Sequence, residues 1–237
     1  MLSYRLINEA SLSGRSHCTQ CTQTIAAYDL IPVFSFCQLK GKCRWCKSPI
    51  SPLYPCIEIL TCILFMGISF FIPTQYWLGT GIFFSALIII IRSDLEYMLI
   101  SQYTTLFLVP IGFLLSALDR IPISLSESLL GAGLGYGFLW AIGSLFSFSR
   151  GKEGIGEGDL DLLCLIGAFT GPLGCMLSLA IGSITASIIS ICYVLINYLI
   201  TKKLEYDIKI PFGPFLAFGA IVAVFQGCCI LSLLYGY

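Results

Sequence analysis

Long apolar runs constrain this chain more than any other feature of its sequence. Seven such runs lie at residues 56–72, 76–93, 98–118, 125–148, 159–174, 175–200 and 211–235. Each is close to the roughly 20 residues that cross a bilayer as a helix. Charged residues make up only 11% of the 237 residues, too few to give a soluble globule a polar surface. The sequence therefore predicts an all-α, polytopic transmembrane helix bundle, with the lipid bilayer as its surroundings.

Positive charge alternates along the connections between these runs. Basic residues precede the first run and fall in every second connection after it: Lys40, Lys42, Arg44, Lys47, Arg92, Arg150, Lys152, Lys202, Lys203 and Lys209. Only Arg120 lies in a connection of the other set. Under the positive-inside rule, the N-terminal region and the loops 92–98, 149–158 and 201–210 are predicted to be cytoplasmic. The C-terminus is then predicted to lie outside.

The chain divides into two expected units. Residues 1–55 are polar and lack the apolar core of a cleavable signal peptide. Their Gly and Pro residues and the absence of a helical period predict a compact knuckle with little regular structure. Residues 56–237 form the expected membrane unit.

Four cysteines in the N-terminal unit have the spacing of a metal site. Cys18-Thr-Gln-Cys21 and Cys43-Arg-Trp-Cys46 are two C-x-x-C pairs separated by 21 residues. Disulfides are disfavoured in the cytoplasm, so the spacing predicts a structural zinc ion held by four thiolates. Reduced thiols or a redox pair are the alternative. His17 adjoins Cys18 as a substitute ligand, although a solvated histidine is the favoured interpretation.

Cysteines elsewhere have a different expected role. Seven of the twelve lie in or at the ends of apolar runs: Cys56, Cys62, Cys164, Cys175, Cys192, Cys228 and Cys229. There, cysteine behaves as a small hydrophobic residue.

Two acidic residues at predicted membrane boundaries are candidates for catalysis. Asp94 follows an apolar run, and Asp159 follows Gly154, Gly156 and Gly158, whose backbone lets another segment approach closely. Two carboxyl groups that share a proton can divide the work of peptide hydrolysis, one activating water and the other polarising a carbonyl. The residues alone equally allow both acids to be helix-end charges, with Asp159 capping the helix that follows.

Other acidic residues crowd the same predicted surface. Glu96, Glu153, Glu157 and Asp161 are interpreted as solvated loop acids, with Asp161 close enough to Asp159 to repel its charge. Glu58 differs, because it lies near the start of an apolar run. We expect it to pack the N-terminal knuckle against the membrane helices.

Taken in order, these residues resemble the bacterial type IV prepilin peptidases over nearly the whole chain. In the N-terminal unit the resemblance runs through Tyr4-Arg5-Leu6, Arg15 to Cys21, Tyr28 to Pro32, Gly41 to Ser51 and Tyr54-Pro55. In the membrane unit it includes Asp94-Leu95, Gly156-Glu157-Gly158-Asp159 and Ile210 to Ala217. The ordered set of motifs is highly specific.

The resemblance implies a function and a set of site residues. Asp94 and Asp159 would be the catalytic pair of a membrane aspartic endopeptidase, and Cys18, Cys21, Cys43 and Cys46 would bind zinc. The substrates would be prepilins or type II secretion pseudopilins, cut on the cytoplasmic side of the inner membrane after a glycine that precedes their apolar helix. The family often also methylates the new N-terminus with S-adenosylmethionine. The sequence shows no nucleotide-type glycine fingerprint for that cofactor, and nucleic acid is not an expected partner.

Several positions depart from the family pattern. Asp161 stands where the family has lysine, Glu96 replaces an aspartate, and Ile100-Ser101-Gln102 replaces Leu-Pro-Asp. Members also usually have one more transmembrane helix before the segment that matches Tyr4. Two rival functions follow: a membrane scaffold that keeps the fold and zinc but has impaired catalysis, and a transporter that uses Asp94 and Asp159 as a proton relay. The relay is less favoured because both acids lie at one membrane face.

Overall fold

In the computed structural model, helices dominate the described residues, which are 16–150, 156–202 and 210–235. Those residues contain no β-strand, only isolated β-bridges that pair His17 with Thr24 and Lys42 with Pro49. The predicted all-α fold is confirmed. Lys152, Glu153, Lys203, Lys209 and the Tyr4-Arg5-Leu6 motif lie outside the described residues.

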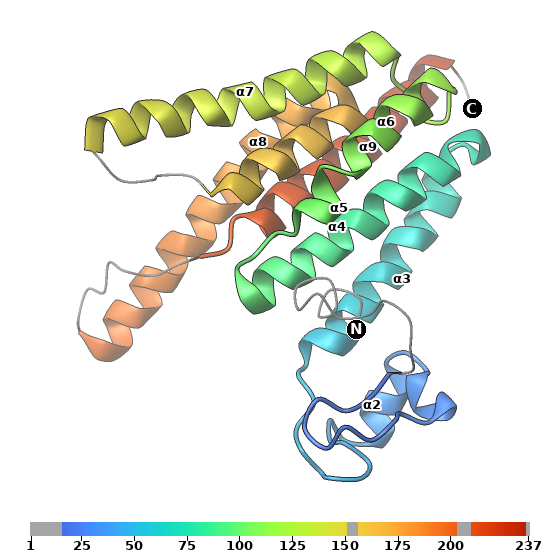
Figure 1. Ribbon diagram of the computed structural model, residues 1–237, viewed down its shortest axis with the longest axis vertical. Coiled ribbons are helices and arrows are strands. Elements are labelled where there is room, and N and C mark those ends of the chain that lie inside the picture. The colour runs from blue at the N-terminus through green and yellow to red at the C-terminus, as the bar shows by residue number, and fades with distance from the viewer. Residues whose placement is uncertain (1–15, 151–155, 203–209, 236–237) are drawn as a thin grey trace.

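The N-terminal knuckle is held by polar contacts around a short irregular chain. It contains the 3-10 helix η1 (Ala27–Leu30) and the short helix α2 (Phe34–Gln38). Arg44 donates two hydrogen bonds to the carboxylate of Asp29, at 2.8 and 2.6 Å, and its guanidinium lies over the ring of Tyr28. The hydrogen bonds from Arg44 lower the pKa of Asp29, so the ion pair is present at neutral pH. Figure 1 shows the knuckle at the N-terminal end of α3, clear of helices α4 to α9.

The membrane unit is a set of apolar helices (Figure 1). In chain order these are α3 (Leu53–Phe71), the 3-10 turn η2 (Thr74–Tyr76), α4 (Trp77–Tyr97), α5 (Gln102–Thr105), α6 (Leu108–Ala117), α7 (Leu125–Arg150), α8 (Glu157–Thr201) and α9 (Gly213–Tyr235). Among the described residues, four helical segments are long and apolar enough to cross a membrane: Leu53–Phe71, Thr74–Tyr97, Leu125–Ser149 and Glu157–Ile200. The segments Gln102–Ala117 and Gly213–Gly227 are shorter apolar helices. The run predicted at 98–118 is thus broken into α5 and α6.

Local sequence explains where two of these helices begin or end. Ser124 and Glu127 form a capping box at the start of α7: the Ser124 hydroxyl accepts the Glu127 N–H, and the Glu127 carboxylate accepts the Ser124 N–H. α4 continues four residues beyond the predicted run to Tyr97, and Met98, whose φ of 52° is left-handed, is its C-cap. Asp94 therefore lies inside α4 rather than in the connection after it.

α8 is not one straight helix. Gly171 within it has φ 71° and ψ −176°, and Pro172 follows. The Cys175 thiol lies 3.8 Å from the Leu163 carbonyl oxygen, whereas residues 12 apart in a straight helix are separated by about 18 Å. The chain therefore turns back at Gly171, giving a first arm (157–170) and a second arm (172–201). The short turn predicted at Gly171-Pro172-Leu173-Gly174 lies at this reversal.

The first arm of α8 lies at the centre of the core. The Ser128 hydroxyl of α7 donates to the Ala168 carbonyl, and the backbones of Gly131 and Gly167 touch. On the other side, the Ser178 hydroxyl of the second arm donates to the Leu216 carbonyl of α9 at 2.8 Å. Small residues permit these close approaches, as is usual between membrane helices. The fully buried side chains include those of Leu162, Leu163, Leu165 and Ile166 in the first arm.

Candidate functional site

Asp94 occupies a buried position near the end of α4. Only 6% of the residue is exposed, and its Oδ2 accepts a hydrogen bond of 2.9 Å from the backbone N–H of Gly213. Gly213 is the first residue of α9, where backbone N–H groups have no partner within the helix. The start of α9 thus supplies the donor that holds the Asp94 carboxyl group in place.

Asp159 lies in the first turn of α8. The N-cap of this helix is Gly156, and no side chain caps it. Asp159 is therefore not the N-cap residue, but as a helix-end acid its charge lies at the favourable N-terminal end of the helix dipole. The residue is partly buried.

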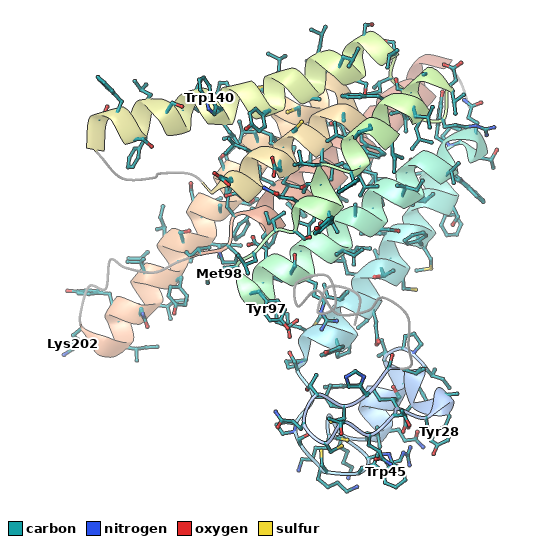
Figure 2. The ribbon with its side chains drawn as sticks, in the orientation of Figure 1. Tyr28, Trp45, Tyr97, Met98, Trp140 and Lys202 are labelled. Atoms are coloured by element: carbon teal, nitrogen blue, oxygen red, sulfur yellow. The ribbon has the colours of Figure 1, made fainter. Side chains whose placement is uncertain are left out.

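The fold brings the two acids together from α4 and α8. The neighbours of both acids meet at one junction, formed by the end of α4, the start of α8 and the start of α9. Ile100 links the two positions: a methyl group added at Gly158 would lie 2.8 Å from its Cβ, and one added at Gly213 would lie 3.2 Å from its Cδ1. Gly158 precedes Asp159, and Gly213 binds Asp94, so a single side chain packs against the neighbours of both acids. Figure 2 marks the end of α4 with the labels of Tyr97 and Met98.

A cavity of about 460 Å³ borders Asp159. Residues from α7, both arms of α8 and the segment before α9 line it: Phe138, Leu139, Ile142, Gly156, Asp159, Leu179, Ser183, Ile210 and Phe212. Among the described residues, Asp159 is the only ionisable one in this lining. The cavity therefore presents a carboxyl group to an otherwise largely apolar space.

Two of the acids interpreted as solvated are placed differently by the fold. Asp161 is only 6% exposed, because it lies inside the first arm of α8 rather than in a loop. Glu96 is exposed, as expected, but it lies in α4 rather than in a loop and forms an ion pair of 3.3 Å with Arg92. Glu157 is exposed, as expected, and Glu153 lies outside the described residues.

Glu58 joins the knuckle to the membrane helices, as predicted. Its Oε2 accepts a hydrogen bond of 2.7 Å from the backbone N–H of Val33. Val33 has φ 61°, a left-handed conformation that is strained for a β-branched residue. This contact therefore holds the knuckle against the second turn of α3.

The four predicted zinc ligands form one cluster. The Sγ atoms of Cys18, Cys21, Cys43 and Cys46 all lie within 4.8 Å of one another, and those of Cys18 and Cys46 are 3.9 Å apart. Four sulfurs bound to zinc at about 2.3 Å would be about 3.8 Å apart at the corners of a tetrahedron. The cluster fits a zinc ion, and His17 is not part of it among the described residues.

The surroundings of the cluster favour thiolates at Cys18 and Cys46, whereas burial and the sulfurs of these two residues raise the pKa of the Cys21 thiol to about 11. Backbone N–H groups of Cys21 and Gln20 lower the pKa of the Cys18 thiol to about 6. The Ser48 side chain lies 3.0 Å from the Cys46 sulfur and lowers the pKa of that thiol. Zinc binds the deprotonated form of cysteine, so these contacts support the same assignment.

Three residues at the junction of the two acids were not singled out from the sequence. Gly213 and Phe212 belong to the motif Ile210 to Ala217, which the family resemblance included without giving them a role. Ile100 belongs to the segment that departs from the family pattern. The local signal for a helix that begins at Gly213 is the sequence Pro211-Phe212-Gly213, which directly precedes an apolar run.

Comparison with known proteins covers most of the chain. Residues 1–72 match the Bacterial Peptidase A24 N-terminal domain, and residues 81–191 match the Type IV leader peptidase family. The prepilin leader peptidase/N-methyltransferase of Aeromonas hydrophila is 33% identical over 90% of this chain and 72% of that protein. The protein of the same name from Legionella pneumophila is 34% identical over 94% of this chain and 76% of that protein. No solved structure matches the chain.

Proposed function

The chain belongs to the type IV leader peptidase family, and from this premise we propose that it is a membrane aspartic endopeptidase with Asp94 and Asp159 as its catalytic pair. The observation that carries this proposal is that two acids 65 residues apart in the chain approach one junction, where Ile100 packs beside Gly213, the partner of Asp94, and beside Gly158, the neighbour of Asp159. Membership makes the chain a peptidase. The aspartic mechanism is the part that we infer from the geometry.

The proposed reaction divides the work between the two acids. One carboxylate takes a proton from a water molecule, whose oxygen attacks the peptide carbonyl, while the protonated partner donates a hydrogen bond to the carbonyl oxygen. The amine then leaves as it accepts a proton, and the C–N bond breaks. The Gly213 N–H fixes one oxygen of Asp94 during these steps, so the carboxyl group needs little reorganisation.

The cavity beside Asp159 supports prepilin-like proteins as substrates. Relatives bear the name prepilin leader peptidase/N-methyltransferase. We propose that the chain cuts the leader of prepilin-like or pseudopilin precursors after a glycine, directly before their apolar helix. The apolar lining, which includes Leu139, Ile142 and Phe212, suits side chains from such a helix.

The N-terminal knuckle is proposed as a structural zinc unit. Four thiolates would complete the tetrahedral coordination of the ion, which leaves no open position for catalysis. We propose the knuckle (1–55) and the membrane unit (56–237) as two domains. Methylation of the new N-terminus with S-adenosylmethionine is a second proposed activity, and its only basis is the name of the relatives.

The proposed location follows from the loop charges. The chain would span the inner membrane several times, with the knuckle and both acids on the cytoplasmic side and the C-terminus outside. The substrate's leader would then reach Asp94 and Asp159 from the cytoplasm.

Co-expression with a prepilin-like substrate tests the function. The expected result is a leader-cleaved band that disappears when the glycine before the cleavage site is replaced. A folded, membrane-inserted chain that leaves the substrate intact would favour the scaffold alternative, in which the change of lysine to Asp161 has impaired catalysis.

A further inference from the structure

Arg92 is a buried arginine inside a membrane-spanning helix. It lies in α4, two residues before Asp94, and is only 8% exposed. Arginine within a spanning segment is costly and is retained where it has a specific partner. The proposed hydrolysis does not use it, so its position needs another explanation.

Two contacts occupy the guanidinium group. Its Cζ lies 4.0 Å from the centre of the Tyr54 ring, and Nε and Nη2 each lie 3.3 Å from Glu96 Oε2. Tyr54 belongs to the first turn of α3. A desolvated guanidinium over an aromatic ring is a strong contact, so Arg92 joins the last turns of α4 to the start of α3.

Arg92 faces away from the acid that it precedes. Successive residues of an α-helix are rotated by about 100°, so Arg92 and Asp94 point about 200° apart around α4. Asp94 is held on its own side by the N–H of Gly213 in α9. The last turns of α4 are therefore gripped from two sides, by Tyr54 through Arg92 and by Gly213 through Asp94.

The start of α3 is also where the knuckle is attached. Glu58 accepts the N–H of Val33 from the knuckle and lies four residues after Tyr54, on the same side of α3. The Val33–Glu58 contact and the Tyr54–Arg92 contact therefore form one continuous path of contacts. It runs from the four-cysteine knuckle through the first two turns of α3 to Arg92, and then along α4 to Asp94.

We propose that Arg92 is a positioning residue, which stacks on Tyr54 to hold the end of α4 where Asp94 meets Asp159. This contact also couples the knuckle to the catalytic pair. The inference rests on the proposed function and gives the knuckle a mechanical role in it.

Kinetics on a synthetic peptide provide the first test. The probe has a short basic leader, a glycine and an apolar helix, and is assayed in detergent. Arg92→Leu and Tyr54→Leu should each lower kcat by roughly tenfold with little change in KM, because the lost contact affects geometry rather than substrate binding. The double variant should fall no further than either single variant. Tyr54→Phe keeps the aromatic ring, so its kcat should stay within about twofold of that of the parent chain. Arg92→Lys keeps the positive charge, so its kcat should be higher than that of Arg92→Leu.

Crosslinking provides a readout that does not need activity. The pair Ile100→Cys and Gly158→Cys spans the junction between the segment after α4 and the first turn of α8; a Cβ at Gly158 would lie 2.8 Å from the Ile100 Cβ, so the junction must open slightly to reach the roughly 3.8 Å of a disulfide. The rate of oxidative disulfide formation in this pair should fall several-fold when Arg92→Leu or Tyr54→Leu is added. Tyr54→Phe should leave the rate unchanged.

The two readouts separate this inference from the proposed function. An inactive parent chain whose crosslinking rate still depends on Tyr54 and Arg92 would defeat the peptidase proposal and keep the positional link. Additive losses of kcat, or a crosslinking rate that ignores both substitutions in folded protein, would overturn the positioning role.

Discussion

The carboxylate of Asp94 is bound by the backbone N–H of Gly213, a residue that follows it by 119 positions. A methyl group at Gly213 would lie 2.7 Å from Asp94 Oδ2, closer than real Cβ contacts. A larger residue at this helix start would therefore displace the Asp94 carboxyl group. The pairing also explains why α9 belongs to the candidate site although it carries neither of the two acids.

Replacing either acid should abolish cleavage. Asp94→Asn and Asp159→Asn keep the shape of the side chain, but an amide cannot act as the base, so the rate should fall by at least about 10²-fold. The rate of leader removal measures the loss, and unchanged thermal unfolding confirms that the variants are folded. Near-normal processing by either variant would rule out the pair.

Gly213→Ala should impair catalysis while leaving the fold intact. The added methyl group would displace the Asp94 carboxyl group or Ile100, and small misplacements at a reacting centre cost between about ten- and a hundredfold. Gly227→Ala in the same helix is the matched control, because nothing lies within 4 Å of a methyl group there. Equal cleavage rates for the two variants would contradict the assigned role of Gly213.

Purified protein should contain about one zinc ion per chain. Cys43→Ser should lower the zinc content and loosen the knuckle, because metal binding and folding of such a unit are coupled. Elemental analysis and limited proteolysis measure the two effects. Cys192→Ser, which changes an exposed cysteine of the second arm of α8, is the control that should keep the metal. Metal-free protein with an intact knuckle would exclude the zinc assignment.

The glycine contact between α7 and α8 should be sensitive to a single methyl group. Gly167→Ala would push a Cβ into the backbone of Gly131, and overpacking of this kind costs about 1–3 kcal/mol. Gly137→Ala on α7 has open space and should be nearly neutral. The unfolding midpoints of the two variants are compared in one detergent. Similar midpoints would show that α7 and α8 separate easily at this contact.

The loop charges predict which thiols an impermeant reagent reaches from the periplasm. An introduced cysteine at Ser124 should be labelled, and one at Lys202 should be protected. Both positions are exposed, so protection would reflect the membrane side rather than burial. The opposite labelling pattern would refute the orientation.

Sequence patterns predicted the elements of this protein better than the contacts between them. The apolar runs anticipated the helices, and the C-x-x-C spacing anticipated the sulfur cluster, because both depend on residues close together in the chain. The burial of Asp161 was missed, since the spaced glycines before it resembled a loop while the helix in fact begins at Glu157. The Asp94 contact with Gly213 was also missed. It joins segments whose relative placement depends on packing across the whole bundle.

The reversal at Gly171 also bears on how the catalytic pair can move. The first arm of α8 is short, is joined to the second arm without a loop, and touches the α7 backbone through Gly167. Asp159 is thus carried on a hairpin that has little freedom to slide. The end of α4, in contrast, is held by side-chain contacts and one hydrogen bond rather than by packing of backbone against backbone. We therefore expect the end of α4, with Asp94, to shift more than Asp159 when a peptide enters the site.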